Sequence, residues 1–182
     1  VNFEGSNLVG TNFEGAKLLD NNFSNVNLDS SIFKGTIVEN NIFTQASLIS
    51  VNFKNSHLSK NNFDGSNLER TIFTNSKIKH SEFNNSNLHN AEIQNAEIEY
   101  VNFKKSDMTY TNFKESLLKN INLDEAKLWK TKFNEVKIID SKFTKTDIYA
   151  SEFKYANLDG IDFKSSKFSH VDFTNSILNN VD

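Results

Sequence analysis

The chain begins with the pentapeptide Val1-Asn2-Phe3-Glu4-Gly5, and the 177 residues that follow repeat its pattern. The third residue of every five is apolar, which gives 36 apolar centres without one polar exception. A period of five cannot be an amphipathic helix, because at about 100° per residue each repeat would turn the apolar side by about 140°. The repeat instead predicts short extended segments that share one continuous interior.

The other positions of each five have their own character. The first residue is Ala, Ser or Thr in 25 of 37 cases, and in extended backbone it points to the same side as the apolar third residue. The second residue then points outward. All six glycines occupy the fifth position, so the fourth and fifth residues are expected to bend the chain in a conformation that Gly or Asn adopts at little cost.

The apolar centres alternate with a period of ten, which sets the number of segments in one coil. Phe occupies 16 of the 18 alternate centres, with Ile93 and Leu123 as the exceptions. Phe can stack on Phe in successive coils only if a coil has an even number of segments, and two segments cannot enclose a core. Four segments give a coil of 20 residues, a spacing shared by Asn21, Asn41 and Asn61, which are expected to form an internal amide ladder. The sequence thus predicts nine coils in a single domain, residues 1–182.

The repeat pattern, a small residue followed by Asn or Asp, then Leu or Phe, then two variable residues, closely resembles that of the pentapeptide-repeat proteins. Ser66-Asn67-Leu68-Glu69-Arg70 and the five residues 156–160 show it clearly. The resemblance covers the whole chain and implies an all-β fold, a right-handed, four-sided β-helix. Departures are mild: the second position is sometimes Ile or Lys, and Gly is sparse at the fifth.

Composition limits the partners and the compartment. The chain has 20 basic and 23 acidic residues, a net charge of −3, so direct nucleic-acid binding is not expected. No apolar run is long enough to span a membrane and no signal peptide opens the chain, so we expect a cytoplasmic protein without a membrane partner. Because the chain does not begin with Met, Val1 is expected to be an internal or processed start.

No residue cluster indicates catalysis. The many serines sit at the first position, inside the coil, where they serve as small residues. None of the four histidines has a spacing typical of metal ligands, and the chain has no cysteine. Acidic pairs such as Glu97 and Glu99 are expected on a convex surface, whereas general acid–base chemistry needs a pocket. The expectation is a protein without catalytic residues, cofactor or metal, and therefore not an enzyme.

The most aromatic part of the outer surface is the candidate contact for a protein partner. With equivalent residues of successive coils stacked, Tyr149 lies directly above Trp129, while Tyr110 and Lys130 occupy the adjoining corner. Exposed Trp and Tyr are favoured anchors of protein interfaces. The competing interpretation is lateral packing of stacked side chains on a β surface.

Two groups of charges are further candidates. The second positions of the same side alternate in sign, which favours an ion ladder: Asp107, Lys127, Asp147 and Lys167. Five cationic or titratable residues in adjacent coils form a candidate site for an anion such as phosphate or sulfate: His57, Lys60, Lys77, Lys79 and His80. No glycine-rich loop or helix N-terminus supports that site, and a solvated face is the competing interpretation.

Two functions compete. The first is a non-enzymatic scaffold that presents columns of side chains to a protein partner of unknown identity. The second, implied by the resemblance, is mimicry of B-form DNA, in which a rod with a strongly negative surface binds DNA gyrase or a related topoisomerase and protects it from quinolones. The near-neutral charge disfavours the second. End coils without neighbours also favour end-to-end or lateral association between copies.

Overall fold

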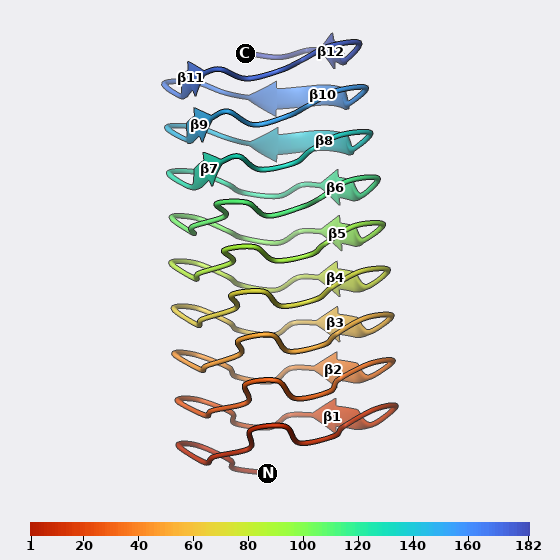
Figure 1. Ribbon diagram of the computed structural model, residues 1–182, viewed down its shortest axis with the longest axis vertical. Helices are drawn as coiled ribbons and strands as arrows, with labels where there is room; N and C mark the ends of the chain where they lie inside the picture. The colour runs from red at the N-terminus through yellow and green to blue at the C-terminus, as the bar shows by residue number, and fades with distance from the viewer.

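The computed structural model describes residues 1–182 as one right-handed coil (Figure 1). The near segments run from left to right and the far segments return as the coil rises from the N-terminus to the C-terminus. Each turn has four sides, each made of one pentapeptide. Side 1 consists of residues 1–5 and the equivalent residues of each later coil, side 2 begins with residues 6–10, side 3 with 11–15 and side 4 with 16–20. No helix has the length and apolar character needed to cross a membrane.

Parallel pairing between equivalent residues of successive coils holds the structure together. Side 4 forms a nine-stranded sheet, seen at the right of Figure 1, from β1 (Lys17–Leu19), β2 (Ile37–Glu39), β3 (His57–Ser59), β4 (Lys77–Lys79), β5 (Glu97–Glu99), β6 (Leu117–Lys119), β8 (Lys137–Lys142), β10 (Asn157–Asp162) and β12 (Ile177–Asn179). Side 2 forms a three-stranded sheet from β7 (Lys127–Trp129), β9 (Asp147–Tyr149) and β11 (Lys167–Ser169). Elsewhere single parallel bridges join the coils, as between Asn2 and Asn22. The predicted coil of four pentapeptides is therefore confirmed.

The bends follow the expected rule with a broader choice of residues. All 36 fifth-position residues have positive φ, and only six of them are glycine. Hydrogen bonds to the next coil support each bend, such as the one from the N–H of Gly5 to the carbonyl of Ser24 (3.0 Å). At Gly65 the amide of Gln45 from the coil below lies where a side chain would point, so a larger residue there would have to displace the end of the Gln45 side chain.

The interior is a column of apolar side chains, 40 of them buried in one cluster. Two stacks of Phe rings rise through sides 1 and 3. In the first, the centroids of Phe23 and Phe43 are 4.9 Å apart and those of Phe43 and Phe63 are 4.7 Å apart, with interplanar angles of 4°. These distances match the spacing of neighbouring β-strands, about 4.8 Å. Where Leu123 interrupts the first stack, the larger Ile121 is buried beside it, which conserves the interior volume.

The expected amide ladder is also confirmed. The Asn21 amide donates to Oδ1 of Asn41 (2.9 Å), and the Asn41 amide donates to Oδ1 of Asn61 (3.3 Å). The Asn61 amide ends the ladder on the carbonyl of Val38 (2.8 Å). All three Asn side chains are buried, so these bonds satisfy groups that water cannot reach.

The terminal coils depart from the expectation that every apolar centre is buried. Phe168 is 45% exposed and Leu178 is 47% exposed. Both belong to the last coil, which lacks a neighbour on one side. Phe163 of the same coil stays buried at 8% exposure because residues 181–182 cover it, so burial of an apolar centre depends on chain lying both above and below it.

Candidate functional site

A cluster of exposed aromatic side chains runs along side 2, from the middle of the coil toward its C-terminal end, and along the corner that follows it. We call it the aromatic strip, and it consists of His89, Tyr110, Trp129, Tyr149 and His170. Its rings touch in two groups. Tyr110 meets His89 at 5.5 Å, while Tyr149 meets Trp129 at 5.9 Å and His170 at 5.5 Å, all edge to face.

The backbone explains why these rings gather. Trp129 and Tyr149 end strands β7 and β9 and are paired in register, at fourth positions whose side chains point outward. Tyr110 and His170 occupy fifth positions with φ of 63° and 57°, so they project from the corner beside them. Tyr110, Trp129 and Tyr149 remain 39–45% exposed. The structure thus brings together the residues that the sequence had singled out here.

Two lysines lie against this strip. The ammonium of Lys127 is 4.3 Å from the centre of the Trp129 ring, and that of Lys130 is 5.1 Å from the centre of the Tyr110 ring. Lys130 Nζ also donates to the Tyr110 hydroxyl (3.0 Å). A cation over an aromatic face is favourable by about 0.5–1 kcal/mol at exposed sites. Lys127, His89 and His170 were not among the predicted contact residues, although comparing each position with its neighbours one coil away would have found them.

The predicted ion ladder forms only at its lowest rung. Lys127 Nζ is 3.1 Å from Asp107 Oδ2, whereas Asp147 and Lys167 have no ion-pair partner. Burial opposes ionisation of Asp107, but hydrogen bonds from Thr109 and Lys127 outweigh it and hold the pKa of this carboxyl below its usual range. The ammonium of Lys127 lies between Asp107 and the Trp129 ring, so it forms no ion pair with Asp147.

The candidate anion site lies on side 4 and the corner after it, and its lysines are already paired with carboxylates of the protein. The carboxylate of Glu97 forms ion pairs with the ammonium groups of Lys77 (2.9 Å) and Lys79 (2.7 Å). The carboxylate of Glu99 also pairs with Lys79 (3.1 Å). We call these four residues the Glu97 cluster. Lys60 pairs with Glu39 of the neighbouring coil (3.3 Å), and the ring of His80 stacks on Tyr100. His57 starts β3 with an exposed side chain.

The Glu97 cluster has the electrostatics of a closed network. Hydrogen bonds donated by Lys79 and then Lys77 hold the pKa of Glu97 below its usual value, and the bonds that Lys79 donates to Glu97 and Glu99 raise the pKa of Lys79. Each shift stabilises the charged form. An added anion would have to compete with these carboxylates, so the geometry does not favour anion binding.

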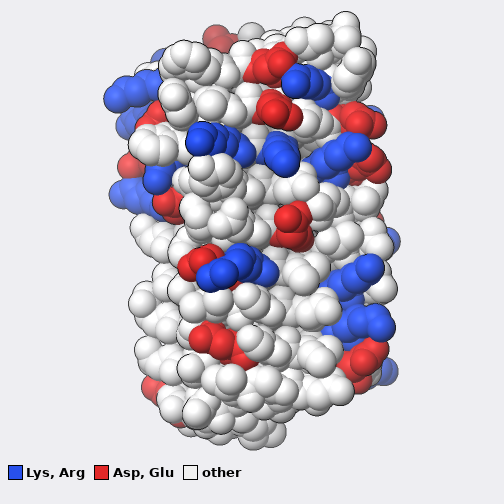
Figure 2. Space-filling model, in the orientation of Figure 1, with Lys and Arg blue, Asp and Glu red and all other residues white.

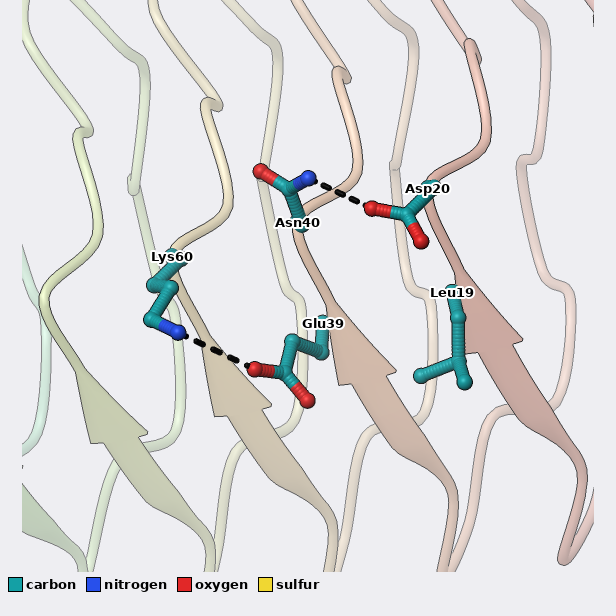
Figure 3. A pocket seen from close by; sticks show the side chains of 5 residues that line it. All are labelled: Leu19, Asp20, Glu39, Asn40 and Lys60. Carbon is teal, nitrogen blue, oxygen red and sulfur yellow. Dashed lines mark hydrogen bonds and ion pairs between the residues drawn. The ribbon is translucent and has the colours of Figure 1, made fainter.

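One shallow depression lies near the N-terminal end of side 4, beside strands β1 to β3 (Figure 3). It is lined by Leu19, Asp20, Glu39, Asn40 and Lys60. The polar groups there bind one another: the Asn40 amide donates to Asp20 (2.5 Å), and Lys60 pairs with Glu39. The depression therefore offers no free group aimed at a ligand.

The side chains that could bind a metal ion or act as nucleophiles form no cluster on the rest of the protein. No group of three or more His, Asp or Glu side chains is placed to hold a metal ion. Most interior serine hydroxyls bond the backbone, as when Ser56 donates to the carbonyl of Phe33 (2.6 Å), while those of Ser31 and Ser76 have no hydrogen-bond partner. On the face shown in Figure 2, basic and acidic side chains are interspersed, and they are sparse near the N-terminal end. This face has no continuous acidic stripe.

Comparison with known proteins agrees with this architecture. The sequence matches the family profile "Pentapeptide repeat region" over residues 46–123 and the profile "Pentapeptide repeats (8 copies)" over residues 1–35 and 141–180. None of the curated proteins matches the sequence.

Two solved structures are similar in fold. A trypsin-treated variant of QnrB1, a plasmid-mediated fluoroquinolone resistance protein, is 18% identical with a TM-score of 0.54, and the match covers 99% of this chain and 90% of that one. HetL, a pentapeptide repeat protein involved in heterocyst differentiation regulation from the cyanobacterium Nostoc sp., is also 18% identical, with a TM-score of 0.41 and coverage of 100% and 86%. At these identities the likeness concerns the fold alone.

Proposed function

Because the chain belongs to the family of pentapeptide-repeat proteins, we propose that it is a non-enzymatic scaffold whose aromatic strip binds a protein partner. One observation carries this proposal: Tyr110, Trp129 and Tyr149 are 39–45% exposed side by side on a surface that is otherwise mostly polar. Trp and Tyr are the residues that most often supply the binding energy of protein interfaces.

The rigidity of the coil supports the same proposal. Trp129 and Tyr149 lie on paired strands, and Tyr110 is held by a backbone hydrogen bond to the carbonyl of Trp129 (2.9 Å). A partner would therefore meet rings that are already in place, and little conformational entropy would be lost on binding. The alternative of lateral packing alone accounts for the ring contacts but not for the exposed ring surface that remains.

A photo-crosslinking experiment tests the proposal. The photoreactive residue p-benzoylphenylalanine is placed at position 129 and, in a separate protein, at position 54, because Lys54 is exposed on side 3 away from the strip. We expect one discrete adduct with another protein from position 129, lost when Tyr149→Ala is added, and none from position 54. No adduct from position 129, or equal adducts from both, would contradict the proposal. An adduct with a second copy of this chain would assign the strip to self-association instead.

A second candidate is protection of DNA gyrase from quinolones by DNA mimicry. The fold shared with QnrB1, a fluoroquinolone resistance protein, favours it. The interspersed charges in Figure 2 and the net charge of −3 weigh against it. A supercoiling assay with purified gyrase and a fluoroquinolone decides the matter: we expect neither inhibition nor drug protection at micromolar protein, and either effect would move this candidate ahead of the first.

A further inference from the structure

Of the three lysines beside the aromatic strip, Lys127 is paired with Asp107, whereas Lys130 and Lys167 have no carboxylate partner. Lys130 is exposed and its ammonium binds the Tyr110 hydroxyl, with no carboxylate partner. Lys167, in β11, has no ion-pair partner either, and its backbone is paired with that of Asp147. From residue 106 to residue 170, side 2 taken alone carries three lysines, Lys127, Lys130 and Lys167, and two aspartates, an excess of one positive charge.

The ammonium groups are placed where a ligand carboxylate would meet them. A lysine that lies over a ring is restrained on one side by the ring, and its remaining N–H donors point away from it. Lys130 is restrained in this way by Tyr110, at 5.1 Å from the ring centre. Hydrogen bonds from a charged donor to a carboxylate are about twice as strong as those between neutral groups. A partner carboxylate would therefore accept a hydrogen bond from an ammonium group that Tyr110 already holds in place.

The same geometry disfavours a sugar as the ligand. Carbohydrates stack on open aromatic faces, but Lys127 occupies one face of Trp129. The rings of Trp129 and Tyr149 are also inclined at 61° and so form no flat platform. The ring surface that stays exposed suits an apolar side chain packed between the rings.

We propose that the aromatic strip binds an acidic segment of a partner protein, in which carboxylates pair with Lys130 and Lys167 and an apolar side chain packs against Trp129 and Tyr149. This inference rests on the proposed scaffold function and adds the chemistry of the partner. It accounts for both features of the strip, the exposed rings and the lysines over them, with one ligand.

Trp129 is the only tryptophan of the chain, so its fluorescence reports directly on the strip. The probe is the peptide acetyl-Glu-Glu-Phe-Glu-Glu-Phe-amide, compared with two versions in which Gln or Lys replaces every Glu. We expect saturable binding of the Glu peptide, at least about fivefold tighter than the Gln peptide at low ionic strength, with the difference shrinking in 0.5 M salt. The Lys peptide should bind most weakly.

Matched variants locate the binding. Lys130→Met should weaken the Glu peptide at least about threefold. Lys54→Met removes an exposed lysine that also lacks an ion-pair partner but has no ring beside it, and it should change nothing. Equal affinity for the three peptides, or an unchanged affinity in Lys130→Met, would overturn the proposal. So would a neutral oligosaccharide such as cellohexaose that binds more tightly than the Glu peptide.

The peptide-binding test and the crosslinking test can contradict the two proposals independently of each other. A specific adduct at position 129 combined with no binding of the Glu peptide would leave the protein contact standing and overturn only the acidic partner. Binding of the Glu peptide without any adduct would instead support the chemistry of the strip and contradict its use by a protein partner under the conditions of the crosslink.

Discussion

On side 4 the ammonium groups of Lys77 and Lys79 end on the carboxylate of Glu97, whereas on side 2 those of Lys127 and Lys130 lie over aromatic rings. Both regions stand on the same backbone, with equivalent residues of successive coils paired in register. The Glu97 cluster on side 4 pairs all of its charges with one another, whereas side 2 leaves Lys130, Lys167 and ring surface available to another molecule. In this fold the interior sets the shape, and the outward second, fourth and fifth positions decide whether a side binds.

The largest effect is expected when the interior under both sides is disrupted. Phe73 is fully buried and stacks on Phe53 at 5.2 Å, so Phe73→Asp would bury a charge in the ring stack. We expect a loss of at least about 4 kcal/mol in the free energy of unfolding. Urea denaturation followed by circular dichroism measures it. Lys54→Asp, on the exposed surface, should stay within about 0.5 kcal/mol, and similar losses for both variants would contradict the assignment of inside and outside.

The next effect concerns the amide ladder behind the corner between sides 4 and 1. The Asn41 amide donates to the carbonyls of Leu18 (2.8 Å) and Glu39 (2.9 Å), and its Oδ1 accepts from the backbone of Asn21 (2.9 Å). Asn41→Ala leaves these buried groups unpaired and should cost about 2–4 kcal/mol. The control Asn157→Ala removes an outward amide of side 4 and should be nearly silent. A cost for Asn41→Ala below that of the control would show that the ladder does not stabilise the coil.

A smaller effect on stability is expected when the Glu97 cluster of side 4 loses its central charge. Glu97→Gln removes the anion that closes side 4 and should cost about 0.5–1 kcal/mol at neutral pH, because the pairs are partly exposed. The pKa of Glu97 is lowered in the folded state, so its contribution is full above the unfolded pKa of about 4.3 and is lost as the pH falls toward the folded value. Stability curves of both proteins should therefore converge on acidification. A constant difference down to pH 2 would mean that the charge of Glu97 is not what stabilises side 4.

The smallest effect on stability is expected on side 2. Trp129→Ala combined with Tyr149→Ala removes two exposed rings and should lower the free energy of unfolding by no more than about 1–2 kcal/mol, measured by urea denaturation. A larger loss would indicate that these rings are retained for the fold, and the contrast between the closed Glu97 cluster and the available surface of side 2 would disappear.

Most of the fold was predictable because it depends on the period alone. The apolar centres, the small first positions and the spacing of Asn21, Asn41 and Asn61 each have one structural solution. The exposure of Phe168 was missed because burial depends on a neighbouring coil, which the pattern within one repeat does not contain.

The site was less predictable because a long side chain can reach several partners on neighbouring coils. The sequence placed Trp129 below Tyr149 correctly, since that follows from the register. It did not show that Lys127 would lie over Trp129 while its ammonium pairs with Asp107, or that Glu97 would take both Lys77 and Lys79. Those contacts depend on rotamers. Equivalent positions of neighbouring coils identify the possible contacts, and the side-chain rotamers determine which of them form.

The stacking of equivalent positions in successive four-sided coils underlies every surface described above, and a cysteine scan tests it most directly. The side chains of Thr74 and Gln94 touch at 3.1 Å, and neighbouring coils are about 4.8 Å apart, within the range that a disulfide bridges. The chain has no cysteine of its own, so Thr74→Cys is combined in turn with His89→Cys, Gln94→Cys or Glu99→Cys. Under mild oxidation only the pair with Gln94→Cys should close rapidly. Preferential closure with His89→Cys or Glu99→Cys would mean coils of three or five sides and would contradict the account.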